Sequence, residues 1–113
     1  MSKAKELKNK IERIPSFEDK LGIRYDNISI ITDDNPDMNY IDIVGDMIEM
    51  DRKKISKEVS INTKVTIYDS DNDIIFTGED SISSDDFLGF YTFDIFVGSI
   101  NLNNISKILV YPY

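Results

Sequence analysis

Apolar and polar residues alternate over most of this chain, and that period of two is the feature that most constrains its fold. The clearest case is the segment SINTKVTIYD, in which Ile61, Val65 and Ile67 fall on one side. Side chains of a β-strand point alternately to opposite faces, so this pattern indicates a strand with one buried face. A chain patterned in this way is expected to fold into sheets.

The same alternation recurs between polar turns. The expected strands cover residues 21–30, 40–50, 60–69, 73–78, 87–97 and 107–113, with TDDNPD at 32–37 and DRKKISKE at 51–58 as loops or turns. A change of phase near Asp26 and Asn27 predicts a bulge, and a second change at Gly45 predicts a slip that leaves either one bulged strand or a pair of strands. About seven short strands without intervening helices predict a mainly β fold, an antiparallel β-sandwich.

The segment KAKELKNKIERI near the N-terminus has a different period. Leu7, Ile11 and Ile14 are spaced as one stripe of a helix, and the proline that follows is expected to end it. The sequence therefore predicts two parts, one short N-terminal amphipathic helix at 1–15 and a β-sandwich domain at 16–113.

Composition excludes several kinds of chemistry. The 113 residues suit a single domain, and 41% hydrophobic with 30% charged residues is typical of a folded globule. The chain has no cysteine and no histidine. Disulfides, thiolate metal sites and the commonest general base are therefore absent, and no glycine-rich phosphate loop replaces them. We expect a protein that is not an enzyme and takes no cofactor.

Charge is unevenly distributed. The net charge is −8; residues 1–14 carry five basic and two acidic side chains, and residues 15–113 carry eight basic and nineteen acidic ones. An acidic body repels phosphate backbones, so nucleic acid is not an expected partner. No stretch approaches the ~20 apolar residues of a membrane span. The sequence has no signal-peptide pattern, which indicates the cytoplasm by default, or export if a leader was trimmed.

The segment YDSDNDII contains the pattern closest to a chemical motif. Asp69, Asp71 and Asp73 match positions 1, 3 and 5 of an EF-hand calcium loop. Ile74 stands at position 6, where that loop needs glycine, and Asp80 stands at position 12 in place of glutamate. A hairpin turn between two strands is the favoured interpretation, and a weak divalent-metal site made of Asp69, Asp71 and Asp73 is the alternative.

Two further charged groups are interpreted as surface features. The acid pairs Asp33–Asp34 and Asp85–Asp86 fall in expected turns, where they lack the cleft that glycosidase-type catalysis needs. The basic group Arg52, Lys53, Lys54 and Lys57 has no interleaved aromatic residue, so a solvated loop is favoured over a phosphate site.

The aromatic segment FLGFYTFDIFV is apolar on both faces. One face holds Phe87, Tyr91, Phe93, Ile95 and Val97. The opposite side holds Leu88, Phe90 and Phe96, interrupted by Thr92 and Asp94. A sheet face open to water is expected to be polar, so Phe90 and Phe96 need a cover. The N-terminal helix is the slightly favoured candidate. A partner protein or a second copy of the chain is the functional one, with Leu88, Phe90 and Phe96 as binding residues.

The segment VTIYD resembles the motif of the FxLYD family of bacterial domains. Tyr68 and Asp69 match it, Val65 and Ile67 replace its Phe and Leu, and DSDND followed by DIIFTG continues the pattern. The resemblance covers about residues 40–111. It implies an immunoglobulin- or fibronectin-like sandwich of largely unknown function, often in exported or envelope-attached proteins, and it supplies no catalytic residues.

These observations favour a non-enzymatic binding or accessory module that mediates protein–protein contacts. The alternative is an intracellular acidic inhibitor or immunity-type protein whose acidic body docks a basic partner.

Overall fold

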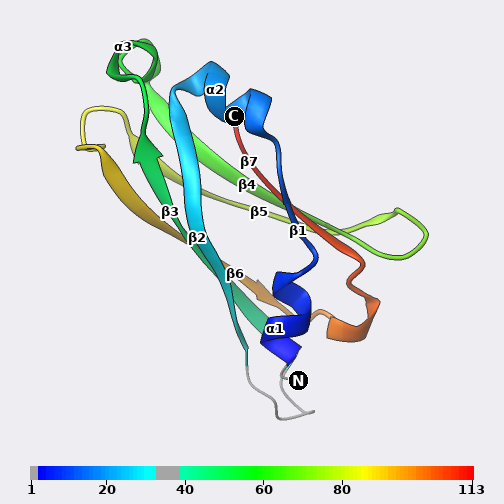
Figure 1. The fold of residues 1–113 in the computed structure, drawn as a ribbon. Coiled ribbons are helices and arrows are strands. Elements are labelled where there is room, and N and C mark those ends of the chain that lie inside the picture. The colour runs from blue at the N-terminus through cyan, green and yellow to red at the C-terminus, as the bar shows by residue number, and fades with distance from the viewer. Residues whose placement is uncertain (1–2, 33–38) are drawn as a thin grey trace.

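The computed structural model describes residues 3–32 and 39–113, which form two sheets with short helices at their ends (Figure 1). In chain order the elements are α1 (Lys3–Lys8), β1 (Ile11–Arg13), α2 (Pro15–Leu21), β2 (Ile23–Thr32), β3 (Tyr40–Glu49), α3 (Arg52–Ile55), β4 (Ser60–Tyr68), β5 (Ile74–Ser83), β6 (Phe90–Gly98), the 3₁₀ helix η1 (Leu102–Asn104) and β7 (Lys107–Pro112). The expected mainly β fold is confirmed at this level. Among the described residues no helix has the length and apolar character needed to cross a lipid bilayer.

The strands form a four-stranded sheet with the order β1-β7-β4-β5 and a three-stranded sheet with the order β2-β3-β6. Neighbours are antiparallel except β1, which runs parallel to β7. In Figure 1, β1 and β7 lie side by side although they come from opposite ends of the chain. The two packed sheets are consistent with a β-sandwich.

The core lies between the sheets and is built from the inward faces of the strands. Tyr25 of β2 crosses this core, where its hydroxyl lies 2.7 Å from the hydroxyl of Thr63 in β4. Its ring meets Phe93 of β6 edge-on, with centroids 5.5 Å apart. Both hydroxyls are buried and satisfied by each other, so the polar contact joins the sheets without an unpaired group in the core.

The slip expected at Gly45 is wrong, because β3 is one continuous strand. The strand pairs with β6 in one unbroken register from Tyr40 to Ile48, and Met47 continues the buried phase. Gly45 also faces the core, where an added Cβ would lie 2.7 Å from Cε2 of Phe93. The glycine makes room for an aromatic ring and marks no change of phase.

The expected bulge in β2 is confirmed. The pairing of β2 with β3 shifts register between Asp26 and Ser29. Asn27 lies inside that shift with φ of 54°, a left-handed conformation that asparagine tolerates better than most residues.

The prediction of one helix across the first fifteen residues is wrong in its extent. Only α1 carries helical structure from that stripe, with Leu7 buried, while Ile11 begins β1. The backbone of this stretch is satisfied by β7, because the N–H of Ile108 donates to the carbonyl of Lys10 at 2.9 Å. Pro15 then begins α2, a helix that the sequence analysis missed. Proline suits the first position of a helix, where no N–H donor is needed.

The loop expected at residues 51–58 contains α3, one short helical turn. Asp51 caps it, since its side chain accepts a hydrogen bond from the N–H of Lys53 at 3.0 Å. Ile55 of this turn is fully buried. The loop expected at 32–37, with its Asp33–Asp34 pair, lies outside the described residues beyond Thr32.

Candidate functional site

The most unusual surface of this protein is the outer face of the β2-β3-β6 sheet, directed away from the core. We call it the outer face, and its residues follow from the strand register: Arg24, Asp26, Ser29 and Ile31 of β2, Tyr40, Asp42, Val44, Asp46 and Ile48 of β3, and Phe90, Thr92, Asp94 and Phe96 of β6. Apolar and acidic side chains share this face.

Two phenylalanines dominate it. Phe90 is 58% exposed and Phe96 is 62% exposed, at opposite ends of β6. The ring of Phe96 stacks on Tyr40 of β3, with centroids 5.8 Å apart and planes 24° apart. It also leans along its own strand over Gly98, where an added Cβ would lie 2.8 Å from the ring. Phe96 is therefore held in place yet open to a partner.

The expectation that the N-terminal helix covers Phe90 and Phe96 is wrong. Helix α1 packs against β2, and its apolar residue Leu7 is buried in the common core. The second half of the expected stripe belongs to β1 and is not available as a helical face. Both phenylalanines stay exposed in the described structure.

Leu88 lies off the outer face although its sequence position suggested otherwise. It precedes β6 in a turn where Gly89 has φ of 102°, and its side chain is 86% exposed. The preceding Phe87 points into the core and is fully buried. Leu88 thus stands beside the end of the face that carries Phe90, and not between the two phenylalanines.

The carboxyl groups of the outer face are not equivalent. Asp46 accepts hydrogen bonds from Asn27 and from Thr92, each at 3.0 Å. Asp42 and Asp94 are diagonal neighbours across β3 and β6. Partial desolvation raises the pKa of Asp42, and the charge of Asp94 together with a side-chain hydrogen bond to it raises that pKa further. Asp42 does not stand out in the sequence, because its neighbour is set by the pairing of distant strands.

The acidic segment at 69–73 forms the hairpin turn between β4 and β5. The carboxylate oxygen Oδ1 of Asp69 accepts from the N–H groups of Asp71 at 2.9 Å and Asp73 at 3.0 Å. Asn72 adopts a left-handed φ of 66° at the tip. The flanking elements are strands, unlike the helices of an EF-hand. The favoured hairpin is therefore present.

The three aspartates still bring their oxygens together. Ligand atoms of Asp69, Asp71 and Asp73 lie within 4.8 Å of one another. Asp69 and Asp71, but not Asp73, border an open cleft of about 500 Å³, whose other wall includes Asn103 and Asn104 of η1. Oδ1 of Asp69 is already used by the turn, which leaves Oδ2 of Asp69 for a divalent ion. Metal binding here stays a prediction.

Two basic residues of the 51–58 segment are used by the fold. Arg52 pairs with Glu49 and donates to the carbonyl of Phe87, and Lys54 donates to the carbonyl of Asp19 at 2.8 Å. The Asp85–Asp86 pair lies in an exposed turn before β6.

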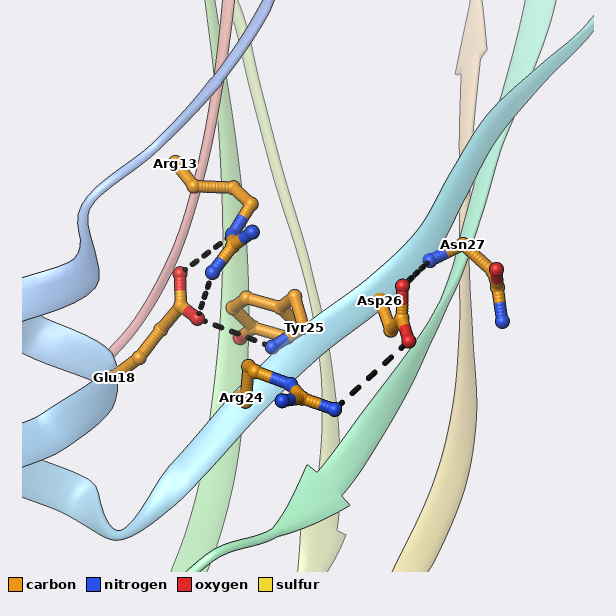
Figure 2. Close-up of polar contacts among 6 residues, drawn as sticks. All are labelled: Arg13, Glu18, Arg24, Tyr25, Asp26 and Asn27. Carbon is orange, nitrogen blue, oxygen red and sulfur yellow. Dashed lines mark hydrogen bonds and ion pairs between the residues drawn. The ribbon is translucent and has the colours of Figure 1, made fainter.

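Figure 2 shows the most buried carboxylate, that of Glu18 in α2, which is 2% exposed. Its two oxygens accept from Nε and Nη2 of Arg13 at 3.0 and 2.8 Å, and one also accepts from the N–H of Tyr25 at 3.1 Å. The hydrogen bond to Glu18 raises the pKa of Arg13 above its ordinary value. A carboxylate held by three donors is a structural tie between α2, β1 and β2.

Comparison with known proteins adds no relative: no family model, no curated protein and no solved structure matches this chain. The resemblance to FxLYD domains thus stays a prediction that rests on its short motif.

Proposed function

We propose that this protein is a non-enzymatic binding module and that the outer face is its docking surface for another protein. The observation that carries the proposal is the pair of exposed phenylalanines, Phe90 and Phe96, on a sheet face that no described element covers. Large aromatic side chains are enriched at the centres of protein interfaces, where burial of their area drives association.

The scaffold suits this role. Strands hold side chains more rigidly than loops do, and Phe96 is further restrained by Tyr40 and by the lack of a side chain at Gly98. The finer assignment, an immunoglobulin- or fibronectin-like sandwich, stays a prediction. Two packed sheets support it, and the placement of β2 beside β3 in one sheet counts against it, since constant-type immunoglobulin domains place their second strand beside the first and fifth.

The test compares matched surface variants in an affinity purification from the source cell. F90S and F96S remove the aromatic groups of the outer face, and I74S removes an apolar side chain of the same 58% exposure as Phe90 from β5 of the other sheet. We expect one specific protein to be retained by the wild type and I74S and to be lost with F90S and F96S. With that protein purified, hydrogen exchange should slow in β3 and β6 on binding.

Thermal unfolding separates binding from folding. Exposed side chains away from the core change stability by about 0.5 kcal/mol or less, so all three variants should unfold near the wild-type temperature. If F90S and F96S are unfolded while I74S is native, the phenylalanines belong to the core and the proposal is wrong.

The acidic inhibitor or immunity-type protein is the second candidate. The nineteen acidic against eight basic residues of 15–113 favour it, since a diffuse negative field attracts a basic enzyme. Its signature is a complex whose yield falls steeply with salt and is indifferent to F90S and F96S.

A further inference from the structure

We propose that the outer face binds its partner through an arginine side chain that enters between Asp42 and Asp94 and lies against the ring of Phe96. This inference rests on the proposed function and adds the chemistry of the partner, a protein surface that combines apolar side chains with arginine.

The strand register places the three side chains together. Asp42 of β3 stands directly opposite Phe96 of β6, and Asp94 stands two residues before Phe96 on the same face. Directly opposed residues have Cβ atoms about 5 Å apart and diagonal ones about 7–8 Å apart, so one planar guanidinium can reach both carboxylates.

These two carboxylates lack a cation of their own. Among the ion pairs of the described residues, none includes Asp42 or Asp94. Asp46 differs, because hydrogen bonds from Asn27 and Thr92 already satisfy it. The raised pKa of Asp42 reflects its desolvation and the neighbouring Asp94, and a cation between the two would remove that repulsion.

Arginine fits this place better than lysine. Its guanidinium binds carboxylates with two parallel hydrogen bonds and also stacks on aromatic faces. Phe96 offers such a face, since the residue is 62% exposed while Tyr40 stacks on one side of its ring. The apolar residues Val44 and Ile48 then line the floor along β3 for the flanking side chains of the partner.

Charge argues against a second copy of this chain as the occupant. The outer face carries four aspartates, Asp26, Asp42, Asp46 and Asp94, against a single Arg24. In a two-fold dimer the same patch meets itself, so these acids would face one another. A basic partner turns the same charges into attraction.

A phage-displayed random peptide library, panned on the immobilised full chain, tests the inference without a known partner. Selected peptides are synthesised and their affinities measured for the wild type, D42N/D94N, F90S/F96S and E12Q/D19N. The last variant is the matched control, because Glu12 of β1 and Asp19 of α2 are exposed acids outside the outer face.

We expect the selected peptides to combine apolar residues with arginine. Their affinity should fall by about tenfold or more in D42N/D94N, as for loss of a close charge pair, and should change less than about twofold in E12Q/D19N. F90S/F96S should weaken the same peptides, and citrulline in place of the arginine should reproduce the loss seen with D42N/D94N.

Two results would overturn the inference in distinguishable ways. In the first, the selected peptides lose affinity for F90S/F96S but are neutral or acidic, or they bind D42N/D94N as well as the wild type. This result refutes the arginine site and leaves the proposed function standing. No enrichment, or peptides indifferent to both double variants, refutes the inference and the proposed docking surface together.

Discussion

Asp42 destabilises the folded state at the place where we propose that an arginine of the partner protein binds. Its pKa is raised by desolvation and by Asp94, so the folded state holds the proton of Asp42 more tightly than the unfolded chain does. The resulting stability is present below the ordinary pKa of aspartate and is lost as the pH rises through the raised value. At neutral pH the ionised pair is therefore a net repulsion.

The substitution D42N removes that repulsion. We expect a higher Tm at pH 7, by about 2–4 °C, as for roughly 0.5 kcal/mol from a cross-strand pair of like charges. The gain should disappear near pH 3, where aspartates are protonated. Circular dichroism melts at pH 3, 5 and 7 measure it, with E12Q, a change of an exposed acid on β1, as a control that should not change. A D42N melt identical to the wild type at pH 7 would contradict the account.

Glu18 has the opposite role, as a charge that the fold has fully satisfied. Its two oxygens accept hydrogen bonds from the guanidinium of Arg13 and from the backbone N–H of Tyr25. In E18Q the side-chain amide turns an N–H₂ group toward one of those donors and leaves Arg13 without its counter-charge. Arg13 is 40% exposed and can be rehydrated, so the cost is that of weakened charge-assisted hydrogen bonds at the buried side chain of residue 18, and we expect about 2 kcal/mol less stability.

Urea unfolding checks this value. E12Q, an exposed change on the neighbouring strand, should stay within about 0.5 kcal/mol of the wild type. A loss equally small in E18Q would show that the three hydrogen bonds seen in Figure 2 do not hold α2 to the sheet.

At the scale of elements, the side chain of Asp69 reinforces the turn between β4 and β5, which two backbone hydrogen bonds also close. The side chain of Asp69 accepts hydrogen bonds from two N–H groups of the turn, which have no strand partner there. The substitution D69A removes both contacts at an exposed position, where water partly replaces them. We expect a loss of about 1 kcal/mol in chemical unfolding and faster hydrogen exchange at Asp71 and Asp73, with the rest of β4 protected as before. Unchanged exchange at both amides would show that the side chain of Asp69 does not stabilise the turn.

Strands were more predictable than helices, for a physical reason. The alternation of Ile61, Val65 and Ile67 is a local record of one buried face, and β4 follows it. The segment from Ile11 to Ile14 carries helix-like spacing, yet the carbonyl and N–H groups of β7 compete for its backbone. That competition comes from the far end of the chain, so no local window contains it.

The candidate site was predictable only in part. Phe90 and Phe96 stand out in their own segment because both faces of that strand are apolar. Asp42, Tyr40 and Ile48 joined the site only once the pairing of β3 with β6 was known, since the sequence alone left the phase of β3 interrupted at Gly45. The prediction that the N-terminal helix covers this face is wrong, because α1 packs against β2 with Leu7 buried.

For the whole molecule, divalent ions distinguish a calcium module from an acidic hairpin. The net charge of −8 means that any divalent cation will screen some repulsion. We expect equal and small rises in Tm with millimolar Ca²⁺ and with millimolar Mg²⁺, because strands flank this turn and Ile74 stands where an EF-hand loop needs glycine. A large rise specific to Ca²⁺ would show binding to the native state at Asp69, Asp71 and Asp73, a rise that D71N should abolish.

The parallel pairing of β1 with β7 has a mechanical consequence. Ile11 aligns with Ile108 and Arg13 with Val110, so the chain enters β1 at one end of the pair and leaves β7 at the other. Tension applied between residues 9 and 113 would draw the two strands past each other lengthwise. Their hydrogen bonds would then be loaded together in shear instead of opening one by one, and the rate of forced unfolding would be set by this clamp. Under tension between residues 9 and 113, the protein would yield late and abruptly.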